Sequence, residues 1–159
     1  MKQRHWVLLR HAHAEATSQN GADADRPLSL RGLSEAKAVA TWLRTELKGR
    51  TPRLLSSPAA RALATAQAVA ETLGIAVRPE PKIFDATPGE LLAILNDQGT
   101  DGVTVLVGHN PGIEQAVALL AEGRSDEYRG MPTASVAWFT VPDGLVEPGA
   151  APLHSYWSP

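Results

Sequence analysis

Three short segments of this chain carry arginine or histidine in a setting where the side chain could meet a ligand. The first is Arg10-His11, which ends the apolar run Trp6–Leu9. The others are Arg61 and His109, each of which follows another apolar run. Arginine presents a planar, permanently charged fork that matches phosphate oxygens. Neutral imidazole can attack phosphorus, and imidazolium can hold charge, so these residue types indicate chemistry on a phosphoryl group.

Strands that run in parallel would bring these side chains together. Four consecutive apolar residues suit a buried strand of a parallel sheet, and the carboxyl ends of such strands line the ligand crevice of open α/β sheets. We predict buried strands over 6–9, 53–57 and 103–107, each followed by a helical pattern. Because parallel strands end at one edge of the sheet, the three junctions are expected to converge in one crevice.

The helix boundaries follow from capping residues. After a polar loop over 13–27, Ser29 is the expected cap of a helix whose apolar positions are Leu30, Leu33, Ala36, Ala40, Leu43 and Leu47, with Gly49 closing it. Ser57 with Pro58, and Asn110 with Pro111, are the expected cap and first residue of two further helices. Thr87 and Glu90 have the spacing of a capping box.

The remaining segments close the sheet. The stretch 75–84 contains Pro79 and Pro81, which confine it to an edge strand or a loop. Segments 134–141 and 153–157 are predicted to form a terminal hairpin at one edge. Strands that alternate with helices predict an α/β fold, a three-layer α/β/α sandwich with a mostly parallel sheet in a single domain over 1–159.

Composition excludes several classes of function. The 159 residues carry a net charge of −2 with scattered charges, so no basic face for nucleic acid or anionic lipid is expected. There is no cysteine, which excludes disulfides and thiolate metal sites and is compatible with a reducing cytoplasm. No apolar run is long enough for a membrane span or a signal-peptide core. We therefore expect a cytoplasmic protein with no nucleic-acid or membrane partner.

Four motifs resemble one known family. Leu9-Arg10-His11-Ala12, Ser56-Ser57-Pro58 with Arg61-Ala62 and Thr65-Ala66, Gly108-His109-Asn110-Pro111, and Arg26-Pro27-Leu28-Ser29 with Gly32 occur in the order found in the histidine phosphatase (phosphoglycerate mutase-like) superfamily. The resemblance covers nearly the whole chain. The short length and Ala12, in place of the usual glycine, are most similar to the phosphohistidine phosphatases of the SixA type.

The resemblance implies a role for each motif residue. His11 would be the nucleophile and would pass through a phosphohistidine intermediate that water hydrolyses. Arg10, Arg61 and His109 would bind the phosphoryl oxygens and offset charge that grows in the transition state. We also assign Asn110 to phosphate binding and expect Ser29 and Gly32 to be structural. No Walker-type glycine loop or acidic metal cluster is present, so neither a cofactor nor a metal is expected.

The general acid is the weakest part of the pattern. In the family it usually follows the third strand, where this chain has Phe84-Asp85-Ala86-Thr87-Pro88. Asp85 is the candidate, but a solvated turn aspartate explains it equally well. An alkoxide leaving group needs a proton, whereas imidazole can leave neutral if its other nitrogen is protonated. A weak acid therefore favours phosphohistidine over a sugar phosphate.

Three functions remain open from the sequence. The first is a phosphatase that acts on phosphohistidine of a phosphorelay or phosphocarrier protein, favoured because no long insertion could close over a small substrate. The second is a small-molecule phosphomonoesterase. The third is a catalytically silent phosphoprotein-binding module, against which the complete set of Arg10, His11, Arg61 and His109 argues.

Overall fold

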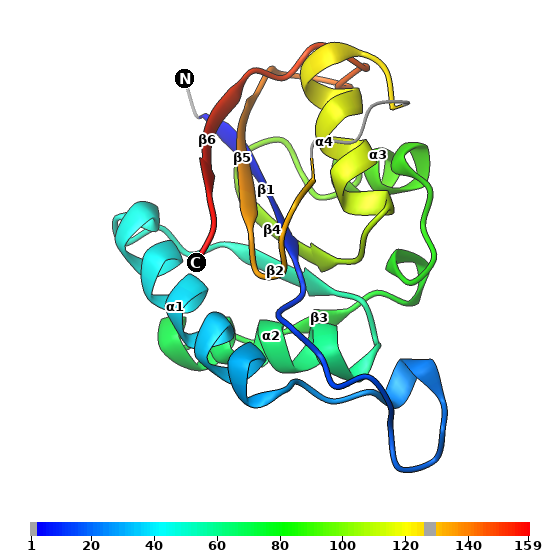
Figure 1. Ribbon diagram of the computed structural model, residues 1–159. Coiled ribbons are helices and arrows are strands. Elements are labelled where there is room, and N and C mark those ends of the chain that lie inside the picture. Colours follow the sequence, from blue (N-terminus) through cyan, green and yellow to red (C-terminus); the bar gives the residue numbers. More distant parts are fainter. Residues whose placement is uncertain (1–2, 126–129) are drawn as a thin grey trace.

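A six-stranded sheet forms the centre of the computed structural model, which describes residues 3–125 and 130–159 (Figure 1). Its order is β3-β2-β4-β1-β5-β6. The strands are β1 (Arg4–Arg10), β2 (Arg53–Ser56), β3 (Arg78–Pro79), β4 (Gly102–Gly108), β5 (Val136–Val141) and β6 (Leu153–Trp157). The neighbours from β3 to β1 are parallel, and the pairs β1–β5 and β5–β6 are antiparallel. The predicted mostly parallel sheet with a terminal hairpin is confirmed.

Within the described residues, four α-helices cover the two faces of the sheet, which gives the three predicted layers. They are α1 (Leu30–Leu47), α2 (Ala60–Leu73), α3 (Pro88–Asn96) and α4 (Gly112–Glu122). Helices α1 and α2 lie on one face, and α3 and α4 lie on the other (Figure 1). Two 3-10 helices, η1 (Asp23–Asp25) and η2 (Pro81–Ile83), lie in the connections. None of the described helices is long and apolar enough to cross a membrane.

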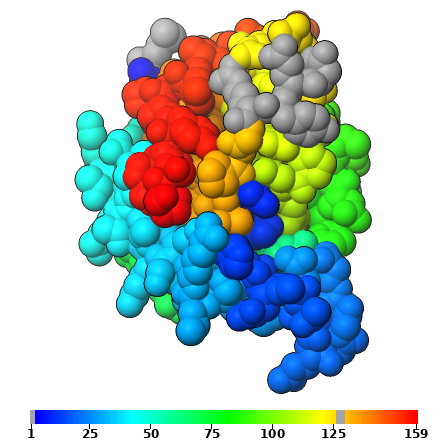
Figure 2. Space-filling view, in the orientation of Figure 1, coloured from blue at the N-terminus to red at the C-terminus, as the bar shows by residue number. Residues whose placement is uncertain are grey.

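The loop between β1 and α1 carries η1 and projects from the body of the molecule, where Figure 2 draws it in blue. Its base is closed by a bridge between Ala14 and Leu28 and by a hydrogen bond from the Glu15 amide to the Pro27 carbonyl at 2.8 Å. The polar segment 13–27 is therefore a loop, as its composition predicts. It stands beside the carboxyl end of β1.

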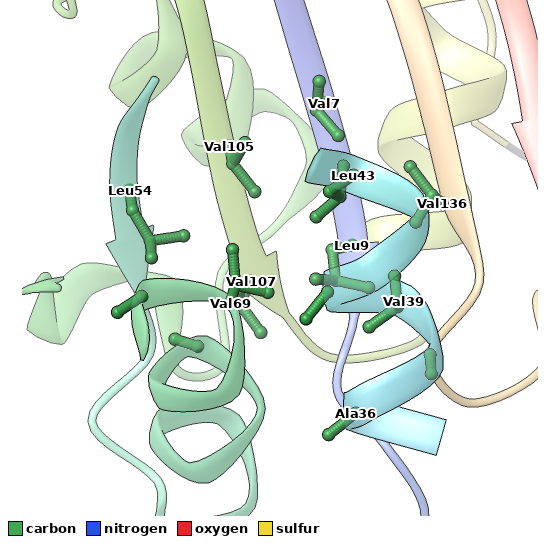
Figure 3. Close-up of a cluster of buried hydrophobic side chains, with 14 of the residues drawn as sticks. Val7, Leu9, Ala36, Val39, Leu43, Leu54, Val69, Val105, Val107 and Val136 are labelled. Atoms are coloured by element: carbon green, nitrogen blue, oxygen red, sulfur yellow. The ribbon is translucent and has the colours of Figure 1, made fainter. Parts of the chain in front are cut away.

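Alternation along the central strands divides the core between the two faces. Val7 and Leu9 of β1 pack with α1 and α2, whereas Trp6 and Leu8 pack with α3 and α4. Figure 3 shows the first of these clusters, in which the valines of β4 meet side chains of both helices. Burial of this apolar surface is the main force that holds the layers together. It fixes the strand ends relative to the helices that follow them.

The buried face of α1 differs from the predicted one. Leu30 is 83% exposed and Leu33 is 55% exposed, so both point to solvent rather than into the core. Gly32 takes the inward place: a β-carbon there would lie 1.9 Å from the carbonyl oxygen of His13. Close contact between this glycine and the backbone after His11 sets the rotation of the helix and turns the two leucines outward.

Two helices begin slightly later than predicted, by two residues for the helix expected from Pro58 and by one residue for the helix expected from Pro111. Helix α2 begins at Ala60 and α4 at Gly112, and neither has a side-chain cap. Ser57 Oγ accepts from the Ala59 amide at 3.2 Å, as a cap would, but both expected capping side chains also have a partner on another element. Ser57 Oγ lies 2.7 Å from His109 Nε2, and Asn110 Nδ2 donates to the Met131 carbonyl at 3.0 Å. A tertiary partner has replaced the local capping role of Asn110, whereas Ser57 combines a local hydrogen bond with a tertiary contact.

Other boundaries are close to prediction. The Thr87–Glu90 capping box of α3 is present with both of its hydrogen bonds. Ser29 caps α1 by accepting from the Gly32 amide at 3.0 Å, but the helix ends with Lys48 in the left-handed region, one residue before the expected glycine. The edge strand is confined to Arg78–Pro79, with η2 in place of a continuing strand.

Candidate active site

The junctions after β1, β2 and β4 meet at one edge of the sheet, as their parallel order requires. Arg10 pairs in register with Gly108, and the His11 amide donates to the Gly108 carbonyl at 3.0 Å. The Ser57 amide donates to the Val107 carbonyl at 3.0 Å. These backbone bonds fix the relative positions of the three segments before any side-chain contact is considered.

His11 is buried, with 7% of its surface exposed, and its ring is held in one orientation. Nδ1 lies 2.7 Å from the carbonyl oxygen of Ala12. A carbonyl can only accept, so Nδ1 carries the proton and Nε2 keeps its lone pair. Burial lowers the pKa of His11 to about 4, with Arg61, Arg10 and Arg26 adding to the effect. The ring is therefore neutral and nucleophilic at neutral pH.

Thr65 ties this histidine to the helix that carries Arg61. Its hydroxyl accepts from the Ala12 amide at 2.9 Å and donates to the Arg61 carbonyl at 2.8 Å. Arg61 is the second residue of α2, and it is 7% exposed. The Thr65 hydroxyl thus fixes the segment that carries His11 relative to the helix that carries Arg61.

The charges of three arginines lower the pKa of His11, and we call these three residues the cation cluster: Arg10, Arg26 and Arg61. Arg10 donates to the Met131 carbonyl at 2.8 Å, and its buried Nε has no partner among the described residues. Arg61 donates to Asp23 through both Nη atoms. Unused guanidinium donors around a neutral imidazole are suited to hold the oxygens of a phosphoryl group.

His109 lies against His11, with 5.1 Å between the ring centroids. The Ser57 hydroxyl contacts its Nε2, and Phe84 meets the ring edge-on at 5.4 Å between centroids. Burial, followed by the neighbouring His11 and Arg61, lowers the pKa of His109 to about 3. His109 is therefore a second neutral imidazole with a fixed ring plane.

The candidate acid lies on a different side of His109. Asp85 is exposed, has a left-handed backbone with φ of 57°, and lines a cavity of about 280 Å³. We call this the side cavity; it is lined by Ile83, Asp85, Ala86, Thr87, Pro88, Leu91, His109, Asn110, Pro111, Gly112 and Gln115. Among the described residues, neither His11 nor an arginine lines it. Asp85 therefore lies on the same cavity as His109, and its role as general acid stays a prediction.

Asn110, which the sequence assigned to phosphate binding, also lies on the side-cavity wall. Its amide nitrogen is used on the Met131 carbonyl, and its Oδ1 is buried without a partner among the described residues. An oxygen acceptor repels an anion. In this arrangement Asn110 links α4 to the segment before β5, and phosphate contact through it stays an untested prediction.

Sequence reasoning missed five contributors. Arg26 was noted only as part of the motif before the first helix, without a place in the cation cluster. Ser57 and Thr65 belong to the quoted motif, but their partners lie on other elements. Phe84 stands beside the candidate acid, and its contact with His109 had no sequence signal. Asp23 had none either, because 38 residues separate it from Arg61.

The described residues contain no group of three or more His, Cys, Asp or Glu side chains placed to hold a metal ion. The arrangement offers instead a neutral imidazole, permanent cations and a second imidazole. This set fits transfer of a phosphoryl group to nitrogen without any step that needs an ion.

The fold and the histidine–arginine site define a class of protein, and the comparisons agree: the chain belongs to the histidine phosphatase superfamily (branch 1), whose family model matches residues 6–97. An uncharacterized protein of Mycobacterium tuberculosis is 33% identical over 92% of this chain and 98% of the relative. The phosphohistidine phosphatase SixA of Escherichia coli K12 is 29% identical over 71% of this chain and 73% of that protein.

A solved structure of a protein histidine phosphatase SixA complexed with tungstate has a similar fold. It superposes with a TM-score of 0.80 at 25% sequence identity, over 97% of this chain and 96% of the other. The resemblance inferred from the motifs, and the phosphoglycerate mutase-like fold class, are thereby confirmed.

Proposed function

We propose that this protein is a metal-independent phosphatase that removes the phosphoryl group from phosphohistidine on a protein. The observation that carries the proposal is the fixed tautomer of His11, which leaves a lone pair on Nε2, together with three arginines near enough to lower the pKa of the ring through their charges. The similarity to SixA proteins supports the substrate class.

The chemistry has two steps. His11 Nε2 attacks phosphorus, the bond from phosphorus to the leaving nitrogen breaks, and the leaving imidazole keeps that electron pair. Water then attacks the phosphoryl group on His11, the N–P bond breaks, and orthophosphate leaves as His11 regains its lone pair. Arg10 and Arg61 hold the equatorial oxygens in both steps. Each such donor lowers the barrier by about 3 kcal/mol.

The weak placement of an acid supports a nitrogen leaving group. Asp85 is exposed and lines the side cavity beside His109, and no other carboxylate of the described residues lines that cavity. An imidazole that departs in neutral form places little demand on such an acid. The absence of a long covering insertion suits a side chain presented by another protein, such as a phosphorelay or phosphocarrier domain.

One observation favours a second candidate, a small-molecule phosphomonoesterase. The side cavity adjoins His109, has a volume of about 280 Å³ and includes the Asp85 carboxylate. A small alcohol leaving group could occupy this space and take a proton from Asp85.

The test compares the two substrate classes on one preparation. Phosphate release would be measured from a panel of phosphohistidine proteins and a panel of phosphate esters, with His11→Ala as the matched inactive control. We expect the ratio of kcat/KM to favour phosphohistidine by at least tenfold. A ratio that favours an ester would replace the first proposal with the second, and binding without turnover would indicate a silent module.

A further inference from the structure

Asp23 contacts the phosphoryl-binding arginine although it lies far from it in sequence. It is the first residue of η1, in the loop that projects beside the end of β1 (Figure 2). Its carbonyl oxygen accepts from Arg61 Nη1 at 2.8 Å, and its Oδ2 accepts from Arg61 Nη2 at 3.1 Å. Two of the five N–H donors of this guanidinium are thus directed at one residue of the loop.

The same carboxylate also reaches a second arginine of the cation cluster. Asp23 Oδ1 lies 3.2 Å from Arg26 Nη1, so its two oxygens bridge Arg26 and Arg61. A phosphoryl group would offer these cations oxygens of the same kind. The carboxylate therefore occupies donors that an incoming phosphoryl group could use.

The charge on Asp23 is permanent at neutral pH. Arg61 is the main cause that lowers the pKa of this carboxyl, with Arg26 and His109 contributing. The side chain of Asp23 is 60% exposed, whereas that of Arg61 is 9% exposed. The carboxylate can thus swing into solvent, while the arginine is held by its helix and by packing.

We propose that Asp23 is a specificity-determining residue of the phosphoryl site, whose carboxylate competes with phosphoryl oxygens for Arg61 and weakens the binding of free phosphate. This inference rests on the proposed function, since it takes Arg61 as a phosphoryl ligand. Weaker binding of orthophosphate favours release of the product. A phosphorylated side chain on a protein has further contacts with which to displace the carboxylate, and free phosphate has none.

The loop itself supplies a matched control. Asp25 belongs to the same 3-10 helix and is exposed, but it accepts from Asn20 Nδ2 at 2.6 Å rather than from the cation cluster. Asp23→Asn and Asp25→Asn change the net charge equally. Asp23→Asn also keeps the backbone carbonyl that holds Arg61 Nη1, so the position of the arginine is preserved.

Titration calorimetry with inorganic orthophosphate tests the inference without any turnover. We expect Asp23→Asn to lower the Kd for phosphate by roughly three- to tenfold, because a carboxylate–arginine pair with one buried partner exceeds the usual surface value. Asp25→Asn should remain within about twofold of wild type. If Asp23→Asn binds phosphate equally or more weakly than wild type, Asp23 orients Arg61 rather than competes for it, and the inference is overturned.

Asp23→Ser is the second variant, should the asparagine variant melt well below wild type, and the same tightening is expected of it. This experiment distinguishes failure of the proposed role of Asp23 from failure of the proposed phosphoryl site. Wild type that binds phosphate with no gain in the variants overturns only the role of Asp23. Wild type and variants that all fail to bind phosphate overturn the phosphoryl site and the inference with it.

Discussion

The two sides of His109 are built in different ways. On one side Arg10 and His11 stand at the end of β1 and Arg61 stands on the first turn of α2, held by backbone pairing and the Thr65 hydroxyl, while Arg26 follows η1 in the loop before α1. On the other side the side cavity is bounded by a connection in which Asp85 is exposed and has a positive φ. The first side is rigid and cationic; the second is open and carries one candidate acid.

This difference separates two tasks of a phosphatase. Holding and attacking phosphorus needs fixed charge and a fixed lone pair, which strand ends provide. Protonating a leaving group needs an acid matched to the substrate, which a loop can gain or lose without cost to the core. We therefore expect substitutions on the cation-cluster side to affect every substrate and substitutions in the side cavity to affect only some.

The largest effect is expected from His11→Ala. Loss of the nucleophile should lower kcat by roughly 10³-fold or more for phosphohistidine and ester substrates alike. Phosphate release and thermal melting would be measured on the same samples, with His11→Gln as a second variant that fills the site. Activity within tenfold of wild type in a folded variant would remove His11 from this role.

Next in size are Arg61→Ala and His109→Ala. Each should cost on the order of a hundredfold in kcat/KM, because each removes a group that meets charge developing on phosphorus. Tungstate should raise the melting temperature of wild type and have much less effect on either variant. An equal rise in melting temperature in all three proteins would mean that tungstate binds elsewhere. The cation-cluster side would then not be the phosphoryl site.

Asp85→Asn sharpens the comparison from the side cavity. Turnover of phosphohistidine should change by less than about threefold, whereas hydrolysis of an ester with an alkoxide leaving group should fall by roughly a hundredfold. The ratio of the two rates on one sample cancels errors in concentration and folding. A parallel collapse of both would make Asp85 a general acid for both and advance the phosphomonoesterase proposal.

Ser57→Ala probes the group that joins the two sides. The Ser57 hydroxyl fixes the ring of His109 through a 2.7 Å contact, and its loss should lower kcat by roughly three- to tenfold, the equivalent of one hydrogen bond. Ser57→Thr should restore the contact and the rate. Ser56→Ala is the matched control, because that hydroxyl bonds the Ser57 carbonyl and not His109. A similar loss in Ser56→Ala would point to general disturbance of the junction.

The smallest expected effect is on stability at mildly acid pH. The pKa values of His11 and His109 are lowered to about 4 and about 3, so the unfolded chain binds protons that the folded protein does not. The free energy of unfolding should hold above pH 6.5 and fall as pH drops from there toward about 4. Melting at pH 7.5 and 5.5 would show this, and His109→Gln should flatten the difference. A variant with an unchanged slope would contradict the buried neutral state.

The sequence by itself indicated the strands and the layers, and it predicted site roles for Arg10, His11, Arg61 and His109 that stay predictions. Apolar runs that end in Arg10-His11 and Gly108-His109 can be buried only as central parallel strands, and parallel order alone brings their ends together. The Thr87 capping box was also readable, since both of its partners lie within four residues. Local spacing is enough to predict a contact wherever the two interacting residues are close in the chain.

Only the tertiary structure decided the contacts between distant segments. Leu30 and Leu33 fit an apolar helix pattern, yet close approach of Gly32 to the His13 backbone turned them outward. Ser57 and Asn110 have side chains that often cap helices. Here the Ser57 hydroxyl contacts His109, and the Asn110 amide donates to the Met131 carbonyl. Asp23 meets Arg61 across 38 residues. Hydrogen bonds and steric contacts depend on distance in space, and for residues far apart in the chain only the folded structure gives that distance.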